Sequence, residues 1–139
     1  MGATGMTQPK TIILVVEDND DDLFFLMRAF KSAGIEDRVF RVEDGGKAIA
    51  YLDGQGEFKE RDKYPLPELV LLDLKLPIYS GHEVMAWIQS QPKFRDLPVF
   101  ILTSSNEALD RNRSKQLGVT GYFVKPLSAE QLSGILDTR

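Results

Sequence analysis

Five acidic side chains fall within six residues in the stretch LVVEDNDDDLFF, which spans residues 14–25. The apolar run Leu14–Val16 comes first, and the acids that follow it are Glu17, Asp18, Asp20, Asp21 and Asp22. Carboxylates at this spacing raise the cost of ionising one another, so such a cluster is expected to hold a partner. Oxygen ligands without nitrogen or sulfur suit a hard divalent cation such as Mg²⁺, which leaves coordination positions open for phosphate oxygens.

Three other side chains that could do chemistry each end an apolar run. Asp73 lies within LVLLDLKLP, Thr103 within VFILTSS and Lys125 within GYFVKP. A carboxylate such as that of Asp73 can accept a phosphoryl group as an acyl phosphate. The Lys125 ammonium would neutralise charge on that group, and the Thr103 hydroxyl would donate a hydrogen bond to it. If they meet, these residues complete an acyl-phosphate site.

Whether they meet depends on the elements that carry them. Five runs rich in Val, Ile, Leu or Phe predict strands at Thr11–Val16, Arg38–Val42, Leu69–Leu72, Val99–Leu102 and Thr120–Val124. Most lack clean alternation of apolar and polar residues, which is typical of strands buried on both faces. The segments between them have helical spacing. Capping boxes at 80–83 and 128–131 predict two helix starts, and Gly34 predicts a helix end.

Alternating strands and helices predict an α/β fold, with a doubly wound, five-stranded parallel sheet and helices on both faces. Ligands bind such sheets beyond the carboxyl ends of the strands, where the strand order reverses. The acids that follow the first strand, together with Asp73, Thr103 and Lys125, would therefore converge on one crevice. We expect one domain over residues 11–139, preceded by a flexible, small and polar N-terminal tail at 1–10.

Bulk composition narrows the classes of function. The chain has 139 residues, of which 42% are hydrophobic and 27% charged, and this favours one globular domain. A net charge of −4 argues against nucleic acid as a partner. The chain has no cysteine, which excludes disulfides and zinc thiolates. No run is long enough to span a membrane and the N-terminus has no signal peptide, so we expect a cytoplasmic protein without membrane contact.

Four motifs together resemble the response-regulator receiver domain of bacterial two-component signalling, the family of the chemotaxis regulators. They are LVVEDND, LLDLKLPIYSG, ILTSS and GYFVKPL, in the family's order, and the likeness runs from Thr11 to the end of the chain. It implies a (βα)5 flavodoxin-like fold with strand order 2-1-3-4-5. The insert DGQGEFKERDKYPLPE at 53–68 and the LLDLKLP signature resemble more narrowly the stand-alone regulators that partner cyanobacterial-type phytochrome kinases.

The resemblance implies a role for each acid at the crevice. Asp73 would be the phosphoacceptor. Asp18 and Asp73 would bind Mg²⁺ directly, Glu17 would bind it through water, and the backbone carbonyl of Lys75 would be a further ligand. Glu17 stands where the family more often has Asp.

The resemblance also implies the phosphoryl contacts and the output. Thr103 and Lys125 would contact the phosphoryl group, Lys125–Pro126 would be a cis peptide, and Tyr122 would be the switch aromatic. The chain would be a phosphoacceptor rather than an enzyme, taking its phosphoryl group from the phosphohistidine of a sensor histidine kinase, with the phytochrome type as a candidate.

The chain ends about one helix after the fifth predicted strand, so we expect its output to pass through a partner. Candidates are a downstream protein, a histidine-phosphotransfer protein, and a homodimer. The surface expected to change is formed by the fourth helix (about 107–117), the fifth strand and the fifth helix.

Plainer interpretations compete at several positions. Asp20, Asp21 and Asp22 are expected only to favour the dipole of the first helix. Ser105 or Asn106 is expected to cap the fourth helix. His82, the only histidine, is expected to be an ordinary helix residue, since one histidine without other nitrogen or sulfur ligands makes a poor metal site. The 53–68 insert is expected to be an extended helix end and a surface loop, either for the kinase or simply tolerated.

Other classes of protein fail at identifiable positions. An EF-hand loop starting at Asp18 would need Gly where Leu23 stands and Glu where Ala29 stands. A haloacid-dehalogenase-type phosphatase would need Asp in place of Lys75. The competitor left open is a degenerate receiver that acts as an unphosphorylated scaffold, and the acids, Thr103 and Lys125 argue against it.

Overall fold

A computed structural model describes residues 11–137 and has the predicted topology. The five strands are parallel and lie in the order β2-β1-β3-β4-β5. They span β1 Ile13–Val16, β2 Val39–Val42, β3 Leu69–Leu72, β4 Val99–Thr103 and β5 Gly121–Val124. Three of them begin one or two residues later than predicted, and the predicted strand at β4 extends to Thr103. The predicted tail at 1–10 lies outside the described residues.

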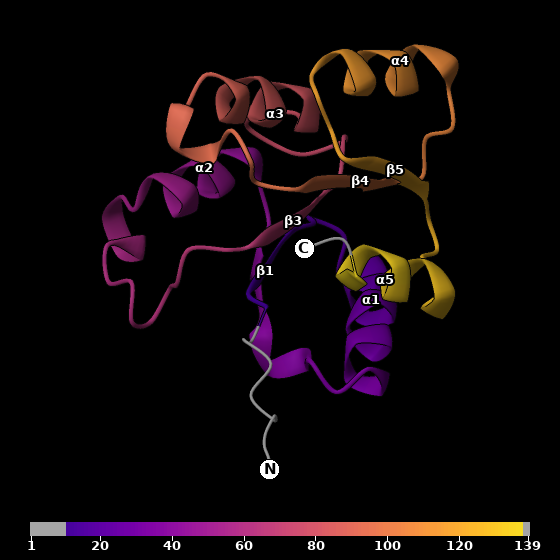
Figure 1. Cartoon of the computed structure of the whole chain (residues 1–139), viewed down its shortest axis with the longest axis horizontal. Helices are drawn as coiled ribbons and strands as arrows, with labels where there is room; N and C mark the ends of the chain where they lie inside the picture. Colours follow the sequence, from indigo (N-terminus) through magenta and orange to yellow (C-terminus); the bar gives the residue numbers. More distant parts are fainter. Residues whose placement is uncertain (1–10, 138–139) are drawn as a thin grey trace.

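Helices cover both faces of the sheet. They are α1 Asp20–Ser32, α2 Gly45–Asp53, α3 Gly81–Gln89, α4 Ala108–Gln116 and α5 Ala129–Asp137. Figure 1 shows α1 and α5 together on one face and α2, α3 and α4 on the other. Each face encloses its own apolar core: Leu14 and Val16 of β1 belong to one, and Ile13 and Val15 to the other. The lack of alternation along this strand therefore results from burial on both sides. None of the helices within 11–137 is long and apolar enough to cross a membrane.

Local capping explains where most of the helices begin and end. The predicted capping boxes form: Ser80 and Glu83 exchange hydrogen bonds at α3, and Ser128 and Gln131 do so at the start of α5. Gly34 follows α1 with φ of +75°, a left-handed conformation that favours glycine. The capping prediction for α4 was wrong, because its N-cap is Glu107, without a side-chain cap.

The fourth helix is attached to the protein largely by polar contacts. Among its described residues only Ser114 is buried, and the Ser114 hydroxyl lies 3.0 Å from Nε2 of His82 on α3. His82 lies in the third helix, as expected, and this buried hydrogen bond links it to α4. At the start of α4, Ser105 donates its hydroxyl to Asp110 over 2.6 Å. An element held by few apolar contacts opens or shifts more easily than the rest of a domain.

The 53–68 insert folds back onto α2. After α2 ends at Asp53, a short 3-10 turn at Gly56–Phe58 takes the place of the expected extended helix end, and it buries Phe58 against Tyr51. Arg61 donates hydrogen bonds to the carbonyl oxygens of Leu52 and Tyr64. The Tyr51 hydroxyl donates to the carbonyl of Pro65 over 2.8 Å. Much of the insert is thus part of the packed structure.

The buried phenol of Tyr51 predicts a pH dependence for this packing. Burial raises the pKa of Tyr51 from 10.0 to about 12. The folded state then holds the phenolic proton more tightly than the unfolded state, so this stabilisation is complete below pH 10 and is lost as the pH rises through 12.

Urea unfolding between pH 8 and pH 12 should therefore separate wild type from Tyr51→Phe. The free energy of unfolding of wild type should fall by about 2 kcal/mol more than that of Tyr51→Phe over this range. The comparison cancels the titration of lysines common to both proteins. If the free energy of unfolding falls equally in the two proteins, burial does not raise the pKa of this phenol.

Candidate functional site

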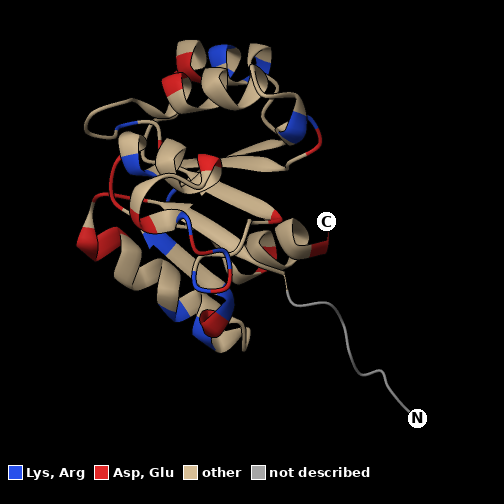
Figure 2. Ribbon diagram, turned by 90° about the vertical axis from the view of Figure 1, so that its left-hand side faces the viewer, with Lys and Arg blue, Asp and Glu red and all other residues tan. Residues whose placement is uncertain are grey.

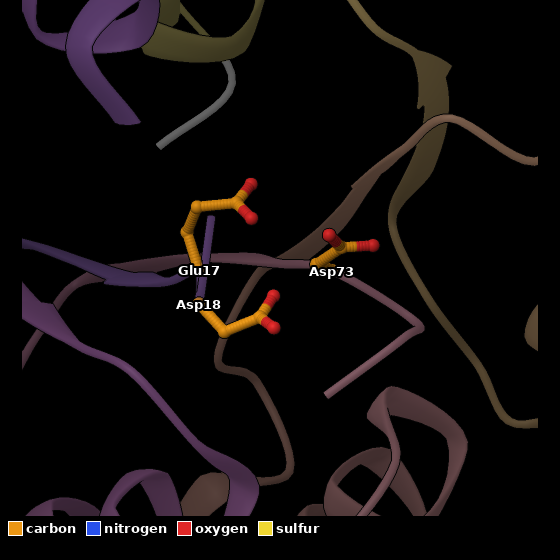
Figure 3. A group of neighbouring side chains, drawn as sticks. All are labelled: Glu17, Asp18 and Asp73. Atoms are coloured by element: carbon orange, nitrogen blue, oxygen red, sulfur yellow. The ribbon is translucent and has the colours of Figure 1, made fainter. Parts of the chain in front are cut away.

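Three carboxylates meet at the carboxyl edge of the sheet. Val16 of β1 pairs with Leu72 of β3, so the residues that follow these strands lie side by side. Glu17, Asp18 and Asp73 each place a carboxylate oxygen within 4.8 Å of the others, and Figure 3 shows their carboxylates gathered at one place. Glu17 and Asp73 are buried while Asp18 is exposed, so the cluster opens to solvent on the Asp18 side.

The backbone around Asp73 holds its side chain in place. Its Oδ1 accepts hydrogen bonds from the amides of Leu74 at 2.6 Å and Lys75 at 3.3 Å. The loop then turns back closely, and a Cβ at Gly81 would lie 2.2 Å from the Asp73 carbonyl oxygen. Lys75 thus reaches the site through its amide, and the metal-ligand role of its carbonyl stays a prediction. The predicted cis peptide at Lys125–Pro126 is present.

Lys125 brings its ammonium group to the same acids. Its amide donates to the carbonyl of Thr103 over 2.9 Å, which continues the pairing of β4 and β5. Its Nζ lies 2.6 Å from Glu17, 2.8 Å from Asp73 and 2.8 Å from Asp22. Of the residues predicted to converge on Asp73, Glu17, Asp18 and Lys125 lie together in the structure.

Asp22 is the residue of this cluster that the sequence interpretation missed. It lies in the first turn of α1, as expected, but its carboxylate accepts a hydrogen bond from Lys125. No local spacing indicated this contact, because Asp22 and Lys125 are 103 residues apart in the sequence. Asp20 instead pairs with Arg41 over 3.1 Å.

Burial and pairing alter the acidity of this cluster. Burial raises the pKa of Glu17 above its usual value, although the hydrogen bond from Lys125 acts in the opposite direction. Burial also acts to lower the pKa of Lys125, but hydrogen bonds to Asp22, Asp73 and Glu17 outweigh it, and the pKa is raised. The ammonium therefore stays charged at neutral pH, as neutralising a phosphoryl group requires.

The two predicted switch residues lie behind this edge, on adjacent strands. Thr103 is fully buried at the end of β4, and its hydroxyl oxygen accepts a long hydrogen bond of 3.4 Å from the amide of Ser105. Tyr122 of β5 donates its hydroxyl to the Ser105 carbonyl over 2.8 Å. The Arg111 guanidinium of α4 lies 4.6 Å from the centre of the Tyr122 ring. Tyr122 thus joins the strand edge to the weakly packed α4.

The donor set fits a hard divalent cation. Glu17, Asp18 and Asp73 offer oxygen ligands only, and the exposed side of the cluster leaves room for water and a phosphate oxygen. Asp22 is not among these candidate metal ligands. The site thus combines three converging oxygen donors with an ammonium group, the arrangement expected where charge on a phosphoryl group must be neutralised.

Comparison with known proteins agrees with this geometry. The family model for the response regulator receiver domain matches residues 13–137, which is nearly the whole described chain. The chain belongs to the response regulator receiver family. It is thus the receiver domain of a two-component response regulator, and the predicted doubly wound fold with strand order 2-1-3-4-5 is confirmed. The division into a tail at 1–10 and a domain at 11–139 stays a prediction.

Relatives of this receiver include stand-alone regulators. It is 40% identical to the probable methanogenesis regulatory protein FilR2 of Methanothrix harundinacea, over 91% of this chain and 79% of FilR2. It is 35% identical to response regulator Rcp1 of a Synechocystis species, over 91% of this chain and 84% of Rcp1. The phosphorylated cyanobacterial phytochrome response regulator RcpA has a similar structure, with a TM-score of 0.79 and 35% identity over 92% of this chain and 89% of RcpA. The predicted likeness to phytochrome-associated regulators is confirmed.

Repulsion among the acids predicts an unusual effect of Asp18→Asn on this receiver. Without a cation, removing one of three like charges should relieve repulsion and raise the melting temperature by about 2–4 °C at low salt. Mg²⁺ affinity should fall at least about tenfold, because one oxygen ligand loses its charge. Calorimetry in EDTA and titration with Mg²⁺ would measure the two effects.

A matched control for this test is Asp96→Asn, which makes the same chemical change at an exposed residue before β4, at the opposite end of the strands. It should change neither quantity. A lower melting temperature for metal-free Asp18→Asn would mean that the acids stabilise the fold rather than strain it.

Proposed function

We propose that this receiver accepts a phosphoryl group on Asp73 from the phosphohistidine of a sensor histidine kinase, in a reaction that depends on Mg²⁺. The observation that carries the proposal is the position of Asp73, whose carboxylate belongs to the acid cluster and also contacts the Lys125 ammonium. In the transfer, a carboxylate oxygen of Asp73 forms a bond to phosphorus. The bond from phosphorus to the imidazole nitrogen breaks, and its electron pair stays on the leaving imidazole.

The protein would contribute mainly position and charge to this reaction. The amides of Leu74 and Lys75 hold one oxygen of Asp73, which limits rotation of the carboxylate. Lys125 gives up its contact with Asp73 and donates the same N–H to a phosphoryl oxygen. Asp18 and Asp73 would hold a divalent cation directly and Glu17 would hold it through water, and the cation would supply positive charge against the transferring group. The structure of Rcp1 with Mn²⁺ bound supports a divalent cation in such a regulator.

The partners proposed here follow from the relatives. Likeness to phytochrome response regulators favours a phytochrome-type sensor kinase as the phosphodonor. Output would pass from the α4, β5 and α5 face to a downstream protein, a histidine-phosphotransfer partner or a second copy. On the opposite side of the molecule, which faces the viewer in Figure 2, basic and acidic residues are interspersed, an arrangement that does not favour nucleic acid as a partner. A cytoplasmic location and the lack of other enzymatic activity stay predictions.

The first experiment tests the phosphoacceptor. Wild type incubated with acetyl phosphate and Mg²⁺ should gain about 80 Da, one phosphoryl group, by intact-mass spectrometry, and Asp73→Asn should gain none. Beryllofluoride should likewise bind only with Mg²⁺ or Mn²⁺ present.

Asp96→Asn, the exposed control, should take up the full phosphoryl group, and wild type in EDTA should take up none. A complete adduct on Asp73→Asn would assign the reaction to another residue. A wild type that takes up no phosphoryl group with Mg²⁺ present would instead favour the unphosphorylated scaffold.

The second experiment tests transmission through Thr103 and Tyr122. We expect the Thr103 hydroxyl to move toward the phosphoryl oxygens and vacate space, which the Tyr122 ring would then fill by rotating inward. That rotation must break the hydrogen bond from Tyr122 to Ser105 and the contact with Arg111. Phosphorylation biases two existing states, so the inward rotamer should already be sampled.

NMR with and without beryllofluoride should therefore show shifts at Tyr122 and along α4 in wild type. Thr103→Ala should still bind beryllofluoride but show much smaller shifts there. Activated wild type with an unchanged Tyr122 and α4 would mean that the signal leaves through another surface.

A further inference from the structure

Asp22 has a place in the site that neither the metal nor the acceptor role explains. Its Oδ2 lies 2.8 Å from Nζ of Lys125, as close as the Asp73 carboxylate. It is absent from the group of acids that could hold a cation, which consists of Glu17, Asp18 and Asp73. The contact of Asp22 with the site is therefore its ion pair with the lysine.

The ammonium group of Lys125 is fully occupied in this arrangement. An ammonium has three N–H donors, and three carboxylates surround Nζ at 2.6 to 2.8 Å. Glu17 and Asp73 also belong to the metal cluster, so a cation would share their charge, and phosphorylation would convert the Asp73 carboxylate into an acyl phosphate. Asp22 is neither a candidate metal ligand nor the proposed phosphoacceptor. In the phosphorylated state it would remain a full carboxylate partner of the ammonium.

Helix α1 holds Asp22 in a defined position. The amide of Asp22 donates to the side chain of the N-cap residue Asn19 over 2.9 Å. The Lys125 side chain is 13% exposed and that of Asp22 is 40% exposed, so the pair lies at the rim of the site. The acids beside it differ, because Asp20 pairs with Arg41 and Asp21 is exposed.

We propose that Asp22 is a positioning residue that holds the Lys125 ammonium toward α1 and thereby weakens its contact with the phosphoryl group. This inference rests on the proposed phosphorylation of Asp73. A hydrogen bond to a charged acceptor is roughly twice as strong as one to a neutral acceptor. Each bond that the ammonium keeps with Asp22 therefore opposes movement of the flexible lysine side chain toward a phosphoryl oxygen. The receiver would be phosphorylated less readily than the same site without this acid.

The test compares two isosteric changes in the same helical turn. Asp22→Asn keeps an acceptor oxygen for Lys125 but removes its charge. Asp21→Asn makes the same change to the net charge and helix dipole without altering a partner of the lysine. With acetyl phosphate and Mg²⁺, Asp22→Asn should be phosphorylated about three- to tenfold faster than wild type and bind beryllofluoride about three- to tenfold more tightly. Asp21→Asn should differ from wild type by less than about twofold.

Two further readouts separate positioning from general charge effects. Asp22→Asn should change Mg²⁺ affinity by less than about twofold, since it is not a candidate ligand. Asp22→Glu, which restores the carboxylate, should return the phosphorylation rate to within about twofold of wild type. If Asp22→Asn is phosphorylated faster because it binds Mg²⁺ more tightly, the inference is overturned.

A double-mutant cycle with Lys125→Met tests whether the effect passes through the lysine. Thermal unfolding in EDTA would compare wild type with Asp22→Asn, Lys125→Met and the double variant. The changes in the free energy of unfolding should be non-additive, because each single change breaks the same ion pair. The gain in beryllofluoride affinity should also vanish in the Lys125→Met background. The inference would be overturned if the changes in the free energy of unfolding add up, or if Asp22→Asn still increases the affinity for beryllofluoride in the Lys125→Met background.

The outcomes distinguish this inference from the function on which it rests. A wild type that takes up no phosphoryl group would overturn both. Normal uptake by wild type, with equal rates for Asp22→Asn and Asp21→Asn, would overturn the role of Asp22 alone and leave Asp73 as the acceptor.

Discussion

A partly buried ammonium group among carboxylates is the interaction on which this structure depends. Glu17 and Asp73 are buried at the end of an apolar sheet, where unpaired charges would be costly. Lys125 supplies the opposite charge to both, and to Asp22 at the rim. Because these residues come from α1 and from the ends of β1, β3 and β5, one ion-pair cluster ties together elements far apart in the sequence.

The rest of the fold divides into a rigid part and an adjustable part. The central strands β1, β3 and β4 are fully buried. Strands β1 and β3 carry Glu17, Asp18 and Asp73 at their ends, where close packing limits how far the carboxylates can move. Helix α4 is attached differently, by the contacts of Ser114 with His82, Ser105 with Asp110 and Arg111 with Tyr122. Because few apolar contacts hold α4, a change of charge at the rigid edge can shift this helix.

The relatives place these features in a signalling context. Rcp1 and RcpA match nearly the whole of this receiver at similar identity, so the resemblance extends beyond the four motifs. The 53–68 insert, which contributed to the predicted likeness, packs through Phe58 and Arg61 onto α2. Phe58 and Arg61 of the insert therefore help to stabilise the domain.

The sequence by itself determined the fold and most of the site. Dense apolar runs, in which apolar and polar residues do not alternate, indicated buried parallel strands. The carboxyl ends of such strands meet at one edge of the sheet, so Asp73 and Lys125, which follow two of the runs, were expected to lie there together. Only the tertiary structure decided the partners of individual side chains. Asp22 and Lys125 are 103 residues apart, and local periodicity suggested nothing more for Asp22 than a helix start. Likewise Ser105 bonds to Asp110 rather than capping α4, and His82 bonds to Ser114. Hydrophobic patterning records which face is buried, whereas the pairing of polar groups depends on distances that exist only after the elements have packed.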